Sequence, residues 1–237
     1  MIEELNKIIN ESDNIVFFGG AGVSTESGIP DFRSQDGLYN MKYDYPPETI
    51  LSHSFFLSHK KEFYKFYFDK LVNTDIKPNY THIFLKELED KGKLKGIITQ
   101  NIDGLHEMAG SKKVYNLHGT IYKNHCMLCN KEYSLDEIIG QEIPTCICGG
   151  TIKPDVVLYE EPLDNDVFEE AEKLISSCKT LIIGGTSLTV FPTAYLINYF
   201  DGDNLIIINR DKINVPFKDA IQINDSIGET FKKINLR

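Results

Sequence analysis

Short apolar runs rich in β-branched residues alternate along this chain with segments of helical periodicity. The clearest runs are NIVFFGG (14–20), LKGIITQN (94–101), KTLIIGGTS (179–187) and NLIIIN (204–209). Helical segments such as THIFLKELEDKG (81–92) and DVFEEAEKLISSC (166–178) lie between them. Continuous apolar strands separated by amphipathic helices are typical of a parallel sheet covered on both faces. We therefore predict an α/β fold built on a Rossmann-like, doubly wound parallel sheet.

Two stretches interrupt this alternation. Residues 34–75 are rich in Tyr, Phe, His and Lys at helical spacing, and residues 121–154 contain clustered cysteines. A chain of 237 residues supports one sizeable core and a small additional module. We expect a Rossmann-like domain formed by 1–35, 76–120 and 155–237, and a small helical and zinc-binding module formed by 36–75 and 121–154.

Charge and composition exclude some classes of protein. The formal net charge is −10, which disfavours binding to nucleic acid phosphates. The first fourteen residues, MIEELNKIINESDN, match neither a signal peptide nor a membrane span. We expect a cytoplasmic protein with no nucleic acid or membrane partner; its oligomeric state is left open.

Four of the five cysteines form two close pairs. Cys126 and Cys129 make a C-x-x-C, and Cys146 and Cys148 make a C-x-C followed by two glycines. Such pairs in a reducing compartment favour a tetrahedral Zn²⁺ site, which with four thiolates is closed and structural. His125 beside the first pair leaves a mixed ligand set open, and reduced thiols are the alternative. The fifth cysteine, Cys178, is expected to be a small buried residue.

The loop FFGGAGVSTESGIPDFR (17–33) follows the first strand. Gly20 and Gly22 match the first half of a G-x-G-x-x-G fingerprint, but Thr25 stands at the third glycine and no acid closes a strand about twenty residues later. Hydride transfer is therefore disfavoured. The turn can still offer backbone N–H groups to a phosphate, with Ser24 and Thr25 as hydroxyl donors. A tight structural turn is the alternative.

Polar side chains follow several other predicted strands. They are Gln100, Asn101 and Asp103 after the second run, His118 after VYNL, the turn at 184–187, and Asn209. Ligands of open α/β sheets bind beyond the carboxyl ends of the strands, so these groups should converge with the glycine loop. Taken alone, a histidine such as His118 is more often a packed or solvated residue, but its position at a strand end before a glycine reverses that preference and favours a functional one.

Taken together, these motifs resemble those of the sirtuin family of NAD-dependent protein lysine deacylases. The matching segments occur in family order and span almost the whole chain: GAGVSTESGIPDFR (20–33), TQNIDGLH (99–106), LHG (117–119), the four cysteines, KPDVVLYEE (153–161), GTSLTVFPTA (185–194) and IIIN (206–209). The resemblance implies NAD⁺ as co-substrate, a structural Zn²⁺ and acyl-lysine peptides as substrates.

The resemblance also implies roles for individual residues. His118 would be the general base and Asn101 a second catalytic residue that holds ribose hydroxyls. The expected NAD⁺ contacts are Gly20, Ala21, Gly22, Thr25, Phe32, Arg33, Gln100, Asn101, Ile102, Asp103, His118, Gly185, Thr186, Ser187, Asn209 and Ile227. Of these, Ile102 and Asp103 would form the nicotinamide pocket, and Phe32 would flank the reacting ribose.

The implied chemistry is acyl transfer. Nicotinamide leaves, the amide oxygen of the acyl-lysine attacks the ribose carbon, and His118 then accepts a proton from a ribose hydroxyl. A histidine with a pKa of about 6.5 suits that step at neutral pH. The acyl group passes to ADP-ribose.

Substrate features follow from the same resemblance. Val156, Val157, Leu158 and Tyr159 would pair with an extended peptide by β-augmentation. Glu160 stands where the family usually has glycine and could alter peptide pairing or contact basic flanking residues. Tyr64 is followed three residues later by Tyr67 rather than by the arginine of desuccinylating sirtuins, so neutral acyl groups are favoured.

Two alternatives remain open at this point. The same activated ribose could be captured by a protein nucleophile, which would make the chain a mono-ADP-ribosyltransferase. A zinc-ribbon binding module without catalysis is the alternative from another class, although the polar residues at the strand ends argue against it.

Overall fold

A computed structural model describes residues 1–31, 37–38 and 43–237 of the chain. Its larger sheet contains six strands: β1 (Ile15–Gly19), β2 (Leu94–Thr99), β3 (Val114–Asn116), β7 (Thr180–Gly184), β8 (Asn204–Ile208) and β9 (Ile221–Ile223). All neighbouring pairs are parallel. The predicted strand runs therefore form one parallel sheet, and the predicted fold class is confirmed.

The strand order is β3-β2-β1-β7-β8-β9. Counted among the six strands of this sheet, the order is 3-2-1-4-5-6, which is the order of the doubly wound dinucleotide-binding folds. It reverses between β1 and β7, where Gly19 and Gly184 are paired at the ends of the two strands. A ligand of such a sheet is expected beyond this point.

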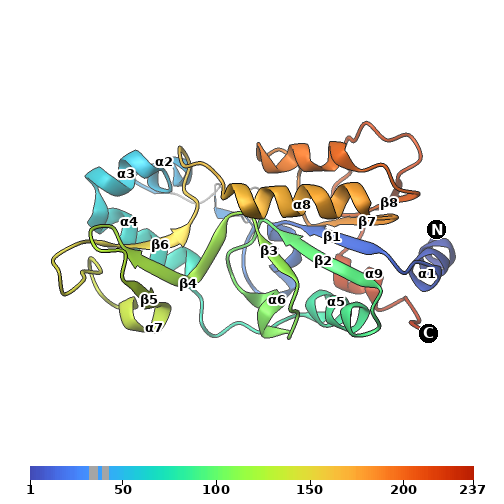
Figure 1. Cartoon of the computed structure of the whole chain (residues 1–237), viewed down its shortest axis with the longest axis horizontal. Coiled ribbons are helices and arrows are strands. Elements are labelled where there is room, and N and C mark those ends of the chain that lie inside the picture. The colour runs from blue at the N-terminus through green and yellow to red at the C-terminus, as the bar shows by residue number, and fades with distance from the viewer. Residues whose placement is uncertain (32–36, 39–42) are drawn as a thin grey trace.

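Helices cover both faces of the sheet. One face packs against α1 (Ile2–Glu11), α5 (Tyr80–Asp90) and α9 (Ile227–Phe231), and the other against α8 (Asn165–Ser177) and the 3₁₀ helix η5 (Thr193–Tyr199). Figure 1 shows α8 on one side of the sheet and α5 and α9 on the other. Side chains of β1 alternate between the two cores, with Phe17 in the first and Phe18 in the second, because successive strand residues face opposite ways.

Local capping explains where two long helices begin. The side chain of Asn79 accepts a hydrogen bond from the Thr81 N–H at 2.9 Å, and α5 starts at the next residue after Asn79. Asp164 does the same for α8, accepting from the N–H groups of Asp166 and Val167. Such caps satisfy N–H groups that have no partner within the helix.

A second, antiparallel sheet lies at one end of the molecule (Figure 1). Its order is β5-β4-β6, with β4 at Gly119–Cys126, β5 at Glu132–Ser134 and β6 at Ile152–Val156. Around it lie α2 (Pro47–Ile50), α3 (His53–Ser58), α4 (Lys60–Phe66), the π-helical turn η4 (Tyr67–Leu71) and α7 (Leu135–Ile138).

The smaller sheet and these helices share a hydrophobic core that includes Phe56, Phe63, Ile121 and Ile152. The two stretches that interrupt the sequence pattern thus pack on one another. The boundaries predicted at 120/121 and 154/155 fall inside β4 and β6, so both strands run across them.

The described residues also include three short helices: η1 (Ala21–Val23), η2 (Thr25–Ser27) and α6 (Leu105–Met108). No helix in the described part of the chain combines the length and apolar character needed to cross a membrane.

Candidate functional site

A cavity of about 740 Å³ lies beyond the ends of the parallel strands, at the point where the strand order reverses. Most of the predicted site residues line it, although they are far apart in sequence: Ala21, Gly22, Thr25, Gln100, Asn101, Ile102, Asp103, His118, Val156, Val157, Leu158, Tyr159, Gly185, Thr186, Ser187, Asn209 and Ile227. The predicted convergence therefore occurs. A cavity of this size and lining has room for a nucleotide cofactor and part of a peptide.

Among the predicted NAD⁺ contacts that the structure describes, Gly20 alone does not line the cavity. Its N–H donates to the Gly184 carbonyl at 3.1 Å. Phe32 and Arg33 lie outside the described residues.

The glycines of the first loop pack against the turn that follows β7. The Gly22 N–H donates to the Gly185 carbonyl at 2.8 Å, and a methyl group added at Gly22 would lie 2.7 Å from the Gly185 Cα. Gly185 itself has a φ of +63°, which favours glycine. The N–H groups of Gly20 and Gly22 are thus paired within the protein. These glycines allow two turns to approach closely.

His118 lies half-buried on the wall of the cavity. Its Nδ1 atom is 3.0 Å from the Gln100 carbonyl oxygen, and a carbonyl can only accept, so Nδ1 carries the proton and Nε2 keeps its lone pair. Burial lowers the pKa of His118 below 6.5, and the Gln100 hydrogen bond only partly opposes this. The pKa of His118 is therefore lower than the unshifted value expected from sequence. The imidazole is neutral at neutral pH and can accept a proton at Nε2.

Asn101, Ser24 and Asp103 form a buried chain of hydrogen bonds. The Asn101 amide donates to the Ser24 hydroxyl at 3.0 Å, and this hydroxyl donates to Asp103 Oδ2 at 2.6 Å. Asp103 Oδ1 accepts from the Leu105 N–H at 2.9 Å. Burial raises the pKa of Asp103 above its usual value, and the hydrogen bonds from Ser24 and Leu105 oppose this only in part. The carboxylate still has lone pairs for one further donor, such as a carboxamide.

The amide of Gln100 is fixed at both ends. Its Oε1 accepts from the Thr186 hydroxyl at 2.9 Å, and its Nε2 donates to the Thr193 hydroxyl at 2.7 Å. These bonds join the loop after β2 to the loop after β7. Residues that follow β7 therefore hold the Gln100 side chain in place at the end of β2.

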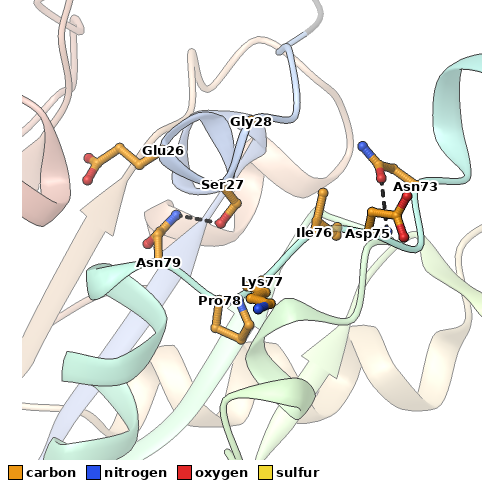
Figure 2. Close-up of a pocket in the computed structure, with 9 residues that line it drawn as sticks. All are labelled: Glu26, Ser27, Gly28, Asn73, Asp75, Ile76, Lys77, Pro78 and Asn79. Atoms are coloured by element: carbon orange, nitrogen blue, oxygen red, sulfur yellow. Dashed lines mark hydrogen bonds between the residues drawn. The ribbon is translucent and has the colours of Figure 1, made fainter.

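Asn79 and Glu26 anchor the glycine loop to other elements. Asn79 donates to the Val23 carbonyl at 2.7 Å and to the Ser27 hydroxyl at 3.1 Å. Figure 2 shows Ser27 and Asn79 pointing toward one another beside a shallow hollow, with the Glu26 carboxylate pointing away from both. That carboxylate accepts from the Ser226 hydroxyl and the Gly228 N–H, each at 3.0 Å, at the start of α9.

Sequence reasoning did not select Asn79, Glu26 or Thr193. The position of Asn79 directly before a helical pattern was a capping signal that could have identified it. Glu26 and Thr193 lie inside the motif segments 20–33 and 185–194, but no local pattern indicates their partners, which are 202 and 93 residues away.

The two tyrosines expected near the acyl group are buried in the core of the smaller sheet and do not line the cavity. Tyr64 donates its hydroxyl to the Ile152 carbonyl, and the Tyr67 ring stacks on Phe63 with a centroid distance of 5.8 Å. Neither is exposed. Lys70, which pairs with Asp69 at 2.9 Å, lines the cavity instead.

The four clustered cysteines converge away from this cavity. The sulfur atoms of Cys126, Cys129, Cys146 and Cys148 all lie within 4.8 Å of one another, with nearest separations of 3.4 and 3.6 Å. Zinc–sulfur bonds of about 2.3 Å in a tetrahedron place sulfurs about 3.8 Å apart, so the set fits a closed Zn²⁺ site. His125 is not part of it, because the set of close ligand atoms contains the four cysteine sulfurs and no ring nitrogen of His125. Cys178 is buried in a hydrophobic core, as expected.

The strand order, the cavity at its reversal and the four-cysteine cluster define a dinucleotide-binding α/β protein with an attached zinc-binding module. Comparison with known proteins narrows this class. A family model described as the Sir2 family matches residues 20–192, and the chain belongs to that family. The family is the one that the sequence motifs indicated.

Individual relatives are similar in sequence to this chain over nearly its full length. The chain is 53% identical to a Clostridium acetobutylicum protein named NAD-dependent protein deacetylase, covering 98% of this chain and 97% of the relative. A Clostridium perfringens protein of the same name is 54% identical, with 98% of each chain covered. A solved structure described as Sir2-p53 peptide-NAD⁺ is 37% identical with a TM-score of 0.87, covering 98% of this chain and 96% of that one.

Proposed function

We propose that this protein is an NAD-dependent protein lysine deacetylase, which passes an acyl group from lysine to ADP-ribose and releases nicotinamide. The observation that carries the proposal is the neutral imidazole of His118 on the wall of a cavity formed at the reversal of the strand order. The names of the relatives support the same activity. We also propose that the enzyme works in the cytoplasm.

His118 accepts a proton at Nε2 from a ribose hydroxyl, because Nδ1 is committed to Gln100. Asn101 and Asp103, linked through Ser24, bind the ribose and the nicotinamide carboxamide. The loop after β7 and Asn209 bind the adenosine half. The four cysteines hold Zn²⁺ as thiolates. Because a four-thiolate site leaves no coordination position for water, the role of the metal is structural, and it keeps the smaller sheet folded.

Two domains share this work in our proposal, and β4 and β6 run across the boundaries that the sequence predicts at 120/121 and 154/155. The Rossmann-like domain binds NAD⁺, and the segment Val156–Tyr159 pairs with the acyl-lysine peptide between the two domains. Four residues of this segment line the same cavity as His118, which supports the assignment.

The charges on the cavity wall bear on which acyl groups the enzyme accepts. A carboxylate on the acyl group requires a bidentate cation to hold it. Neither Tyr64 nor Tyr67 lines the cavity. Among the described residues, the cations that line it are Lys70, Arg210 and Lys212. Lys70 is paired with Asp69, and the other two follow Asn209, at the end that we assign to the adenosine half. Neutral acyl groups, acetyl first, are therefore the preferred substrates.

The test is an NAD⁺-dependent assay on matched acetyl, butyryl and succinyl peptides. We expect acetyl turnover at least tenfold above succinyl, measured as kcat/KM, with nicotinamide and acyl-ADP-ribose formed in equal amounts. Nicotinamide release without acyl-lysine, with label transferred to protein, would instead indicate a mono-ADP-ribosyltransferase. Equal succinyl turnover would contradict the acyl assignment.

A further inference from the structure

The segment that follows β6 is joined to the start of α3 by backbone hydrogen bonds. The Tyr159 N–H donates to the Leu51 carbonyl, and the His53 N–H donates to the Tyr159 carbonyl, both at 3.0 Å. Ser52 and Tyr159 thereby form a short parallel bridge. Leu51 and Tyr159 both line the cavity. The candidate peptide-binding segment is thus attached to the helices of the small module at its far end.

Its near end is attached to His118. The Val157 N–H donates to the His118 carbonyl at 2.9 Å. The segment therefore spans from the proposed general base to α3, and a shift at α3 changes the position of the segment relative to His118.

Glu160 occupies an unusual backbone position in this attachment. Its φ is +74°, in the left-handed region that residues other than glycine, asparagine and aspartate rarely adopt. Its exposed side chain is nevertheless held, because Oε2 accepts from the Ser54 N–H at 2.9 Å and Oε1 accepts from the Ser54 hydroxyl at 3.0 Å. Ser54 lies in the first turn of α3, where N–H groups lack helical partners.

The next residue, Glu161, makes a separate set of bonds. It accepts from the Leu158 N–H at 2.8 Å, and it pairs with Lys153 at 3.0 Å and with His53 Nδ1 at 2.7 Å. Glu161 holds the turn itself, whereas both carboxylate oxygens of Glu160 accept hydrogen bonds from Ser54. The sequence left open an acidic contact from Glu160 to basic peptide residues; the structure instead directs its carboxylate at α3.

We propose that Glu160 is a positioning residue that fixes the segment Val156–Tyr159 against α3 and so sets the affinity for the acyl-lysine peptide. This inference rests on the proposed function. The left-handed backbone is unfavourable for glutamate, and the two bonds to Ser54 offset that cost. Removing the bonds frees the far end of the segment while leaving His118 and the NAD⁺ side of the cavity unchanged.

Three substitutions separate positioning from local stability. Glu160→Ala loses both acceptors and keeps a side chain at the left-handed position, whereas Glu160→Gly loses both acceptors and relieves the backbone. Glu160→Gln keeps an acceptor for the Ser54 N–H. Glu169→Ala, an exposed glutamate on α8, is the matched loss of charge. For each variant we would measure kcat, the KM of an acetyl peptide, the KM of NAD⁺ and the Tm.

We expect Glu160→Ala and Glu160→Gly both to raise the peptide KM by about three- to tenfold, the range expected when the net contribution of one ordinary, solvent-exposed hydrogen bond is lost. The kcat and the KM of NAD⁺ should stay within twofold of wild type. Glu160→Gln should recover most of the peptide affinity. The Tm should fall for Glu160→Ala but not for Glu160→Gly, so that peptide affinity and stability separate. If Glu160→Ala fails to fold, Glu160→Gly still decides the matter.

Two results would overturn the inference. A wild-type peptide KM for Glu160→Gly would mean that the bonds to Ser54 do not position the segment. Equal losses for Glu160→Gln and Glu160→Ala, confined to peptides with flanking lysine or arginine, would assign Glu160 to direct contact with the peptide. Turnover by the wild-type enzyme reports on the proposed function separately, since it does not depend on Glu160.

Discussion

The Nδ1 atom of His118 lies 3.0 Å from the carbonyl oxygen of Gln100, and this single contact sets the tautomer of the proposed catalytic base. The carbonyl belongs to the loop after β2, whose side chains Gln100, Asn101 and Asp103 line the same cavity. The base and the groups proposed to hold the ribose are therefore positioned by one loop. A change in that loop moves both together.

Replacing the imidazole tests its role as a base. We expect His118→Ala to lower kcat for an acetyl peptide by about 10²- to 10⁴-fold, the usual contribution of a positioned general base. Binding of NAD⁺, measured by calorimetry, should change by less than about threefold, because the hydrogen bonds among Asn101, Ser24 and Asp103 do not involve His118. A parallel loss of NAD⁺ affinity would instead assign His118 to cofactor binding.

The activity should also depend on pH in a defined direction. A general base must be neutral to act, so kcat falls as the pH drops through the pKa of His118. Because burial lowers that pKa, the acid limb should lie below pH 6.5. A pH–rate profile of kcat between pH 5 and 9, checked for stability at each pH, measures it. An acid limb above pH 7 would be inconsistent with the neutral imidazole inferred here.

Two buried histidines predict acid-sensitive folding. The rings of His82 and His106 are in contact in a tilted arrangement, with centroids 4.7 Å apart and planes at 59°. Burial lowers the pKa of His82 to about 4 and that of His106 well below 6.5. Their folded pKa values lie below the unfolded value, so the unfolded state binds more protons and stability falls as the pH drops from 6.5 toward 4. The expected slope is about 1.4 kcal/mol per pH unit for each histidine.

Urea unfolding at pH 7.5 and pH 5 measures this dependence. In His82→Gln the side chain still accepts from the Asn79 N–H, as His82 Nδ1 does at 3.2 Å, but cannot titrate. The variant should therefore lose about half of the pH dependence. An unchanged slope would show that His82 is not neutral in the folded protein.

Metal removal should destabilise the small module. Four thiolates at tetrahedral spacing bind Zn²⁺ strongly, and such binding contributes directly to folding. We expect Cys146→Ser, or treatment with a strong chelator, to lower the free energy of unfolding by several kcal/mol and to release about one equivalent of zinc, measured with a colorimetric dye. Cys178→Ser, at the buried cysteine outside the cluster, should leave the zinc content unchanged.

The anchor of the glycine loop predicts a specific effect on the cofactor. Glu26→Ala removes the acceptor for the Ser226 hydroxyl and the Gly228 N–H, and Ile227 between them lines the cavity. Loss of one cap typically costs about 1 kcal/mol, so the KM of NAD⁺ should rise by about two- to fivefold. Glu26→Gln keeps an acceptor and should be milder. Steady-state kinetics with saturating acetyl peptide distinguishes the two, and equal effects of both would exclude a capping role.

Most of the fold and of the candidate site follows from sequence. The apolar runs at 14–20, 94–101, 179–187 and 204–209 all contain strands of one parallel sheet, because uninterrupted apolar runs can be buried only between two layers of helices. The carboxyl ends of parallel strands meet at one edge, which is why the polar residues following them could be predicted to converge. The spacing of the four cysteines likewise predicted two local pairs suited to a metal, whereas the fold brings the pairs together, with the nearest sulfurs belonging to different pairs.

Only the tertiary structure decided which polar groups face one another. The pairing of Gly22 with Gly185, of Ser24 with Asp103 and of Glu160 with Ser54 joins residues that are 79 to 163 positions apart or lie on different elements. Local periodicity encodes helices and strands, but the partner of a side chain depends on how those elements cross. For that reason the left-handed backbone at Glu160, which looks unfavourable in the sequence alone, finds its compensation in a helix encoded a hundred residues earlier.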